Sequence, residues 1–312
     1  ITSGGAAGYQ ASNTFSNIGT GTYELWAEDQ NGCRGQRSGD IVVAGTPTPT
    51  AEAGNNTQTC VNKAIAIAGA TATNYSSFSW SEDGAGSITS GGATFTPTYT
   101  PAAGDAGNTV TLTLTVNGNG NCTPVNDIVT IDVEPLPIAE AGNNTSTCAN
   151  KNVTIAGAAV NNESSYSWSH NGTGSISNGG TLTPTFTPGA GDAGNTVTLT
   201  LTVNGNANCD PVTDIVTIDV EPAPTAEAGD NTSTCIDNGI TITSANATNF
   251  ASYSWSHDGN GSIVNGNTLT PSYTPGAGDA GTTVTMTLTV IGNGNCDPTT
   301  DIVEIEVYAA PT

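Results

Sequence analysis

Cysteine is the residue of this sequence whose spacing most clearly indicates chemistry. Six of the seven cysteines fall into three pairs whose members are 62, 61 and 61 residues apart: Cys60 and Cys122, Cys148 and Cys209, Cys235 and Cys296. A spacing that recurs along a chain is typical of a disulfide framework. We therefore predict three disulfides, each within one repeat, and bonds of this kind persist in oxidising, extracellular surroundings.

Cys33, the seventh cysteine, stands where the second member of a pair would stand. Its partner would lie about 60 residues upstream, before Ile1, if it followed the same spacing. We expect Cys33 to be unpaired in this chain, and this explanation is favoured over a reactive thiol.

Acidic residues offer a second kind of chemistry, because oxygen-only clusters at domain junctions suit calcium. The opposing interpretation is that these acids alternate outward on a last strand and keep its edge soluble. The sequence lacks a dense Asp-x-Asp motif and does not decide between the two. The calcium candidates are Asp132, Glu134, Glu140, Asp219, Glu221 and Glu227.

Three further aspartates, Asp105, Asp192 and Asp279, each belong to a "GDAG" stretch. A short carboxylate in such a stretch commonly accepts hydrogen bonds from backbone amides of its own turn. We expect this capping role rather than metal binding.

A catalytic constellation is not evident in the sequence. The two histidines, His170 and His257, hold equivalent positions, and Glu82 stands there in the first copy. This exchange favours a solvated strand end over a ligand or a base. No Ser-His-Asp set recurs and no Cys/His group has zinc spacing. We predict that the protein is not an enzyme and needs no cofactor, calcium being the one candidate.

The cysteine pairs belong to internal repeats, which start at "AEAGNN" or "AEAGDN" with spacings of 88 and 87 residues. The predicted boundaries are 51–138, 139–225 and 226–312. Residues 1–50 match only the second half of the repeat, and we interpret them as the C-terminal part of a truncated sandwich repeat.

The strand pattern predicts an all-β fold. In "TVTLTLTV", Val110, Leu112, Leu114 and Val116 alternate with threonines, so one face is apolar. About seven such short strands per repeat, separated by Gly, Asn, Asp and Pro, are typical of an immunoglobulin-like sandwich. We expect one tryptophan per repeat in the core between the sheets: Trp80, Trp168 and Trp255.

The charge balance excludes several partners. The chain has 4 Lys and Arg against 27 Asp and Glu, with a formal net charge of −23. Nucleic acid and anionic membranes require basic residues for binding, so neither is expected. No apolar run is long enough to span a bilayer. We expect an extracellular protein at the cell surface.

The unit "AGNNTSTCANKNVTIAG", with "YSWSHNGTGSIS" and "GDAGNTVTLTLTVNGNANC", resembles the PKD-like, immunoglobulin-like repeats of very large Bacteroidota surface proteins. "NIGTGTYELWAEDQNGC" is similar to the end of repeats in SprB-like gliding-motility adhesins. The resemblance implies secretion by the type IX system and a role in adhesion or gliding. It also implies contacts with other domains of the same long chain, surface polysaccharide or other surface proteins.

Two functions follow as expectations. The first is a structural stalk, an extended rod with stiff proline-containing linkers, in which each intradomain bond would shorten the covalent path per repeat from 88 to 26 residues. The second is an array of glycan-binding modules. The alternating Tyr/Phe-Ser-Trp strand places the tryptophan in the core, so the stalk is favoured.

Overall fold

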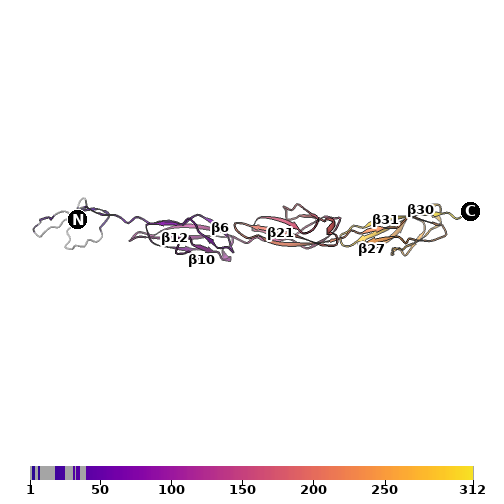
Figure 1. Cartoon of the computed structure of the whole chain (residues 1–312), viewed down its shortest axis with the longest axis horizontal. Coiled ribbons are helices and arrows are strands. Elements are labelled where there is room, and N and C mark those ends of the chain that lie inside the picture. Colours follow the sequence, from indigo (N-terminus) through magenta and orange to yellow (C-terminus); the bar gives the residue numbers. More distant parts are fainter. Residues whose placement is uncertain are drawn as a thin grey trace. The chain divides into compact units, whose positions relative to one another are not determined.

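The computed structural model describes residues 2–3, 6–7, 18–24, 31, 33–35 and 40–311. The chain divides into two compact units, Ile1–Glu134 and Pro135–Thr312. Among the described residues the regular structure is strand apart from three single-turn 3-10 helices (Figure 1). The predicted all-β class is confirmed. We use repeat 1, repeat 2 and repeat 3 for residues 51–138, 139–225 and 226–312.

Repeat 1 forms a four-stranded sheet, β6-β13-β12-β9, a three-stranded sheet, β10-β11-β7, and the short pair β5-β8. The last strand, β13, pairs antiparallel with β12 and parallel with β6. Its elements are β5 (Thr50–Glu52), β6 (Thr57–Cys60), β7 (Ile65–Ala66), β8 (Thr71–Thr73), β9 (Tyr75–Glu82), β10 (Ser87–Ser90), β11 (Thr98–Thr100), η1 (Ala103–Asp105), β12 (Thr109–Gly118) and β13 (Val125–Glu134).

Repeats 2 and 3 have the same strand order and pairings. The elements of repeat 2 are β14 (Ile138–Glu140), β15 (Thr145–Cys148), β16 (Val153–Thr154), β17 (Ala159–Asn161), β18 (Glu163–His170), β19 (Ser175–Ser177), β20 (Thr185–Thr187), η2 (Ala190–Asp192), β21 (Thr196–Gly205) and β22 (Val212–Glu221). Those of repeat 3 are β23 (Thr225–Glu227), β24 (Thr232–Cys235), β25 (Ile240–Thr241), β26 (Asn246–Thr248), β27 (Phe250–His257), β28 (Ser262–Val264), β29 (Ser272–Thr274), η3 (Ala277–Asp279), β30 (Thr282–Gly292) and β31 (Thr299–Tyr308).

Residues 1–50 contain two described strand pairs. β1 (Thr2–Ser3) pairs antiparallel with β2 (Ala6–Ala7), and β3 (Gly21–Tyr23) pairs antiparallel with β4 (Ile41–Val43). Much of "FSNIGTGTYELWAEDQNGC" lies outside the described residues, so the interpretation of this segment as the end of a sandwich repeat stays a prediction.

Each repeat has nine strands instead of about seven, and a break in the first strand accounts for one of the added strands. β5 ends just before Gly54, whose φ of 100° favours glycine. A Cβ at Gly54 would lie 2.4 Å from the Ala68 carbonyl oxygen, so the close approach also requires glycine. After this bend the chain changes partner, from β8 to β13. The break therefore lets β6 run parallel to the last strand.

The core of each repeat follows the predicted alternation. Val110, Leu112, Leu114 and Val116 of β12 are at most 2% exposed. The equivalent residues of β21 and β30 are also buried, and each set belongs to its own hydrophobic cluster. One buried ring also stands in each core: Tyr99, Phe186 and Tyr273.

Of the predicted core tryptophans, Trp255 belongs to its buried cluster, whereas Trp80 and Trp168 lie at the margin of theirs. Trp255 is 9% exposed, whereas Trp80 and Trp168 are half-buried and pack against their clusters. Each indole N–H donates to a loop carbonyl 3.0–3.1 Å away: Thr94, Thr181 and Thr268. The indole N–H needs such a partner, which explains why the ring sits near a loop.

A buried carboxylate joins two loops in every repeat. Asp105 is 3% exposed and accepts a hydrogen bond from the Ala102 N–H of its own turn at 2.9 Å. It also accepts from the N–H groups of Ala85 at 2.6 Å and Gly86 at 3.0 Å, and from the Tyr99 hydroxyl at 2.8 Å. The capping role predicted for this aspartate is confirmed, and the structure extends it to a second loop.

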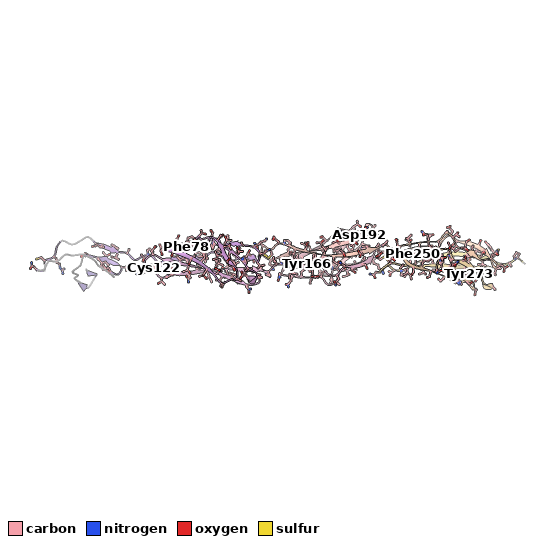
Figure 2. The ribbon with its side chains drawn as sticks, turned by 90° about the horizontal axis from the view of Figure 1, so that it is seen from below. Phe78, Cys122, Tyr166, Asp192, Phe250 and Tyr273 are labelled. Carbon is pink, nitrogen blue, oxygen red and sulfur yellow. A yellow bond between two sulfur atoms is a disulfide. The ribbon has the colours of Figure 1, made fainter. Side chains whose placement is uncertain are left out.

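The other two copies keep the carboxylate but change some of its donors. Figure 2 labels Asp192 of repeat 2 and Tyr273 of repeat 3. In repeat 2, Phe186 has no hydroxyl, and the Thr173 hydroxyl donates to Asp192 at 3.0 Å instead. In repeat 3, both the Tyr273 hydroxyl at 2.7 Å and Asn260 Nδ2 at 3.1 Å donate to Asp279. Because a buried charge needs full hydrogen bonding, the substitutions compensate one another.

These contacts shift the protonation of both partners. Burial would raise the pKa of Asp279, but hydrogen bonds from the Asn260 N–H, the Tyr273 hydroxyl and the Gly276 N–H outweigh it and lower the pKa to about 2. Burial, together with the bond to Asp279, raises the pKa of Tyr273 to about 12. The carboxylate is therefore ionised and the phenol neutral at physiological pH.

We predict that Asp279→Asn destabilises repeat 3 by about 3 kcal/mol, because charge-assisted bonds are lost and buried donors are left unsatisfied. Hydrogen exchange followed by mass spectrometry measures each repeat separately. The matched control is Asp237→Asn, since Asp237 is exposed. Equal protection in the two variants would show that the carboxylate does not stabilise the fold.

Acid should reproduce part of this loss. The folded pKa of Asp279, about 2, lies below its ordinary value of 3.8. Its contribution to stability is therefore fully present above about pH 4 and is lost as the pH falls toward 2. We expect the stability of repeat 3 to fall over this window in the wild type and less steeply in Asp279→Asn. Parallel acid profiles would contradict the assignment.

Candidate functional site

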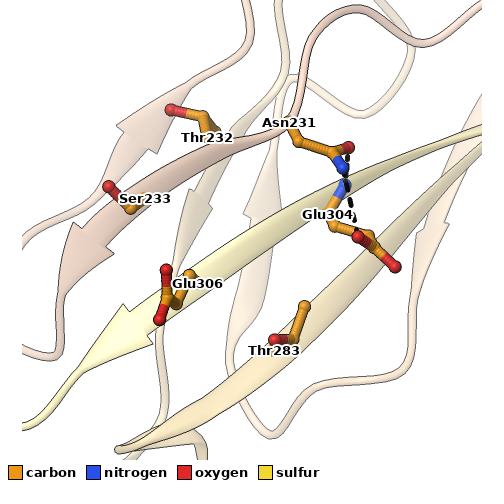
Figure 3. A pocket seen from close by; sticks show the side chains of 6 residues that line it. All are labelled: Asn231, Thr232, Ser233, Thr283, Glu304 and Glu306. Atoms are coloured by element: carbon orange, nitrogen blue, oxygen red, sulfur yellow. Dashed lines mark hydrogen bonds between the residues drawn. The ribbon is translucent and has the colours of Figure 1, made fainter.

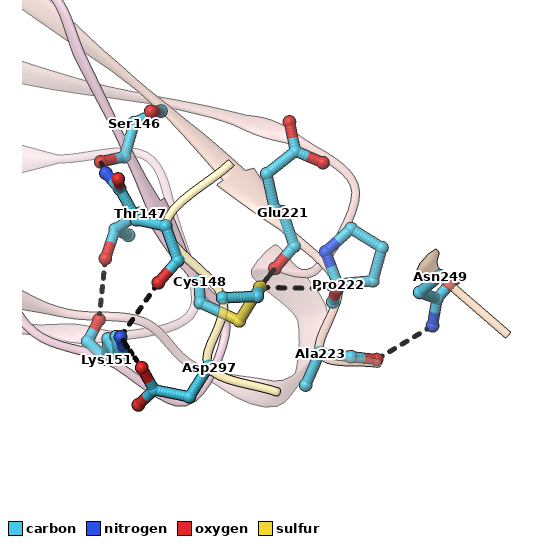
Figure 4. Close-up of a disulfide and its surroundings, with 11 residues drawn as sticks. Ser146, Thr147, Cys148, Lys151, Glu221, Pro222, Ala223, Asn249 and Asp297 are labelled. Atoms are coloured by element: carbon cyan, nitrogen blue, oxygen red, sulfur yellow. Dashed lines mark hydrogen bonds and ion pairs between the residues drawn. A yellow bond between two sulfur atoms is a disulfide. The ribbon is translucent and has the colours of Figure 1, made fainter. Parts of the chain in front are cut away.

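The junction between repeats 2 and 3 holds a disulfide between Cys148 and Cys296 (Figure 4). The two Cα atoms are 4.9 Å apart, although 148 positions separate the residues in sequence. Cys148 is the last residue of β15, and Cys296 lies in the hairpin between β30 and β31. The first cysteine of one repeat is thus bonded to the hairpin cysteine of the next.

This pairing shows that the predicted intradomain disulfides are wrong. Cys148 is bonded to Cys296 and not to Cys209, while Cys122 and Cys235 are free. Cys60 and Cys209 are disulfide-bonded, but neither to its predicted partner.

The parallel pairing of the first and last strands explains the error. Cys148 lies opposite Glu221, at the end of the ten-residue strand β22. Cys209 precedes the start of that strand. A ten-residue strand is roughly 33 Å long, whereas disulfide-bonded Cα atoms lie within about 7 Å. The two cysteines of one repeat therefore occupy opposite ends of the sandwich. Cys33 is exposed, and the expectation about its partner stays a prediction.

The hairpin of repeat 3 packs tightly on the linker that joins the repeats. A Cβ at Gly292 would lie 2.5 Å from Cys296 Cβ and 3.0 Å from Pro224 Cδ, so this position requires glycine. The Cys296 sulfur lies 3.6 Å from the Pro222 carbonyl oxygen. Glycine and proline thus bring the hairpin to the point where the disulfide forms.

Polar contacts accompany the disulfide across the junction. Lys151 Nζ lies 2.6 Å from Asp297 Oδ1 and donates to the Asn295 carbonyl at 2.8 Å. Asn295 Nδ2 donates in turn to the Ser146 carbonyl at 3.1 Å. Asp297 is 71% exposed, and an exposed ion pair is worth roughly 0–1 kcal/mol. These contacts orient the hairpin, whereas the covalent bond holds it.

The linker is also tied to the repeat that follows it. Asn249 adopts a φ of 56°, which asparagine tolerates, and its Nδ2 donates to the Ala223 carbonyl at 3.0 Å (Figure 4). Asn162 makes the same bond to Leu136 at 2.9 Å in the linker before repeat 2. Two prolines and one side-chain bond therefore restrict the linker Pro222–Pro224.

The calcium candidates do not come together. Among the described residues, no group of three or more His, Cys, Asp or Glu side chains could hold a metal ion. Asp132 and Asp219 lie on β13 and β22, and each accepts a hydrogen bond at 2.6 Å from a neighbouring threonine hydroxyl. Glu140 belongs to a different sheet from β22. Asp132 and Asp219 are exposed between buried neighbours on their strands, which is the outward alternation of the opposing interpretation.

Each large sheet carries a polar depression whose lining includes residues of its last two strands. In repeat 3 its lining includes Asn231, Ser233, Glu304 and Glu306 (Figure 3), and Asn231 Nδ2 donates to Glu304 Oε2 at 3.1 Å. The equivalent depressions of repeats 1 and 2 contain Asp132 with Glu134 and Asp219 with Glu221.

The two histidines differ in part from expectation. His170 and His257 are half-buried, and each Nδ1 is buried without a hydrogen-bond partner. Their rings contact Phe186 and Tyr273 edge-on, with centroids 5.4 and 5.1 Å apart. Each histidine ends its strand, as predicted, but its imidazole packs over the core ring and is only partly solvated.

Sequence reasoning missed the polar residues of the junction. Lys151 follows its cysteine by three positions, and Asp297 directly follows the hairpin cysteine. A signal existed, since Lys63 and Asp210 hold the equivalent positions in neighbouring repeats. The basic residue Lys151 near Cys148 and the acidic residue Asp297 beside Cys296 attract each other, so charge of this kind indicates which two cysteines are bonded.

No family model matches the chain, and no curated protein matches it. Solved structures do match. A fragment of the titin I-band, domains I67–I69, is 12% identical with a TM-score of 0.51, over 84% of this chain and 99% of that one. An E-to-A mutated variant of I67–I69 is 12% identical with a TM-score of 0.52, over 83% and 98%. The described residues contain no helix long and apolar enough to cross a membrane. At this identity the likeness concerns the fold, and the fold of the chain is a tandem array of immunoglobulin-like β-sandwich domains.

Proposed function

We propose that the chain is a structural stalk segment of a large secreted cell-surface adhesin or filament, used for surface adhesion or gliding motility, without enzymatic activity. The observation that carries this proposal is the Cys148–Cys296 disulfide, which joins consecutive repeats beside their peptide linker. A junction with two covalent connections suits a protein that transmits tension. It has no evident use in an isolated binding module.

The bond changes the route of tension through Pro135–Thr312. Taken by itself, the Cys148–Cys296 bond gives a covalent path of the 13 residues before Cys148 and the 16 after Cys296, with residues 149–295 outside it. Much of this path is already extended as β14, β15 and β31. The expectation of a 26-residue covalent path per repeat is therefore replaced by a covalent path that can lengthen only slightly under tension.

The same bond contributes to thermodynamic stability. Closing a loop of 148 residues is worth about 5 kcal/mol in the chain-entropy model. An immunoglobulin-like array with disulfides is typical of extracellular proteins, and the net charge of −23 keeps such a chain soluble. These properties support an extracellular stalk. Its partners would be domains of a longer chain, surface polysaccharide or other surface proteins.

Glycan binding is the less supported alternative. A sugar platform requires an exposed aromatic face. Trp255 is buried, and Trp80 and Trp168 pack against the core with their N–H groups satisfied. The extended-rod shape expected from the proline-containing linkers is part of the stalk proposal.

Single-molecule pulling of the full chain tests the stalk, with Cys60 and Cys209 both replaced by serine so that no other disulfide enters the loop closed by Cys148–Cys296. After reduction, each of repeats 2 and 3 should release about 88 residues, a step of roughly 300 Å at 3.3–3.6 Å per residue. In the oxidised chain these two steps should be absent, because residues 149–295 carry no tension. Cys235→Ser leaves the bond intact and should behave like the wild type. Full-length steps from the oxidised chain would exclude a shielded array.

Replacement of a tryptophan separates the two candidate functions. We expect Trp168→Ala to lower the stability of repeat 2 by about 3 kcal/mol, as measured by hydrogen exchange, with no glycan binding in the parent to lose. Ser167→Ala, on the exposed side of the same strand, is the control. A parent that binds on a glycan array, together with a stable Trp168→Ala variant that does not, would favour the glycan-binding function instead.

A further inference from the structure

Cys235 is the equivalent of Cys148 in repeat 3, yet its thiol is free and exposed. Both residues end the second strand of their repeat and lie opposite the last strand, Cys148 facing Glu221 and Cys235 facing Tyr308. The same residue at the same place in the fold is therefore bonded in one repeat and open in the next.

The backbone around Cys235 already has the conformation of the bonded copy. Asn238 N–H donates to the Cys235 carbonyl at 2.9 Å, as Lys151 N–H does to Cys148 at 2.9 Å. The Thr234 hydroxyl donates to the Asn238 carbonyl at 3.0 Å, as in the Thr147–Lys151 pair at 3.1 Å. The turn is thus preformed and needs no rearrangement to accept a partner.

The two copies differ in the solvent exposure of the cysteine and of the threonine before it. Cys148 is 0% and Thr147 3% exposed, because the hairpin of repeat 3 lies against them. Cys235 is exposed and Thr234 only half-buried. Hence the surface around Cys235 matches the surface around Cys148, which is occupied by the hairpin that carries Cys296.

We propose that Cys235 and its turn, Ile236–Asn238, form a covalent docking site for the cysteine-bearing hairpin of a further copy of this repeat. The known junction defines the partner's chemistry. It presents a thiol at the tip of a β-hairpin, and a side chain like Asn295 that donates to the carbonyl equivalent to that of Ser146, here Ser233.

The charges select which hairpin fits. Lys151 meets Asp297 at the known junction, but the position equivalent to Lys151 is the neutral Asn238 in repeat 3. Among the three hairpins, repeat 1 alone lacks the acid and has Thr123 after its cysteine. That cysteine, Cys122, is also free. The occupant of the Cys235 site is therefore a hairpin of the repeat 1 type.

Bond formation requires an oxidant, and a small disulfide such as oxidised glutathione supplies it. The Cys235 thiolate attacks this disulfide, forms a mixed disulfide and releases one thiol. The hairpin thiolate then attacks the Cys235 sulfur and releases the second thiol. Two protein thiols become one disulfide, and one small disulfide becomes two thiols.

The test extends the full chain after Thr312 with a copy of residues 51–138. Thr312 corresponds to Thr50, so the appended copy starts in register. After exposure to oxidised glutathione, non-reducing peptide mapping should find Cys235 bonded to Cys122 of the appended copy. Maleimide labelling of Cys235 under native conditions should fall at least ten-fold relative to the unextended chain.

Two variants keep this result interpretable. Cys122→Ser in the appended copy removes the bond, and hydrogen exchange on it shows whether the added repeat folds. An extension with residues 226–312 provides a second folded partner, whose hairpin carries Asp297. If either added repeat is folded and Cys235 is recovered only as the free thiol or bound to glutathione, the docking site is refuted.

A charge exchange tests the choice of hairpin. Asn238→Lys should accelerate bonding to the Asp297-type hairpin about two- to five-fold at low salt, as expected for one exposed ion pair. It should not accelerate bonding to the Thr123-type hairpin, and Thr123→Asp in the appended copy should restore the effect. Equal rates for all four combinations would overturn the selection by charge.

Discussion

The parallel pairing of the first and last strands is the constraint on which the rest of this structure depends. It places Cys148 beside Glu221, at the end of repeat 2 from which the linker leaves. It also places the last hairpin of each repeat at the opposite end. Cys148 lies far from Cys209 and can bond to the hairpin cysteine of repeat 3, so this bond passes between domains.

The remaining features of the junction serve this geometry. Gly142, the equivalent of Gly54 in repeat 2, breaks the first strand and allows its second part to join the last strand. Gly292 lets the hairpin approach Pro224, and Asn249 holds the linker through Ala223. Within each sandwich, the buried aspartate ties the loop before the penultimate strand to the loop across from it. These contacts fix the loops within each repeat and the linker between repeats 2 and 3.

The sequence allowed much of the fold to be predicted. Alternation in "TVTLTLTV" identified the central strand and its core face, and the "GDAG" aspartate was correctly interpreted as a cap. The pairing of cysteines could not be obtained from spacing, because spacing records that the residues recur but not at which end of a strand they lie. That information required the parallel register of β15 with β22, which is a long-range property of the backbone. The packing of the histidines was missed for a related reason, since the ring beneath them comes from a distant strand.

The central claim is that the disulfide crosses the junction between repeats, and disulfide mapping of the native chain tests it most directly. The chain is digested without reduction, the linked peptides are identified by mass spectrometry, and the digest is repeated after reduction. The account predicts a peptide pair that contains Cys148 and Cys296 and disappears on reduction. A peptide pair that links Cys148 to Cys209 would contradict it.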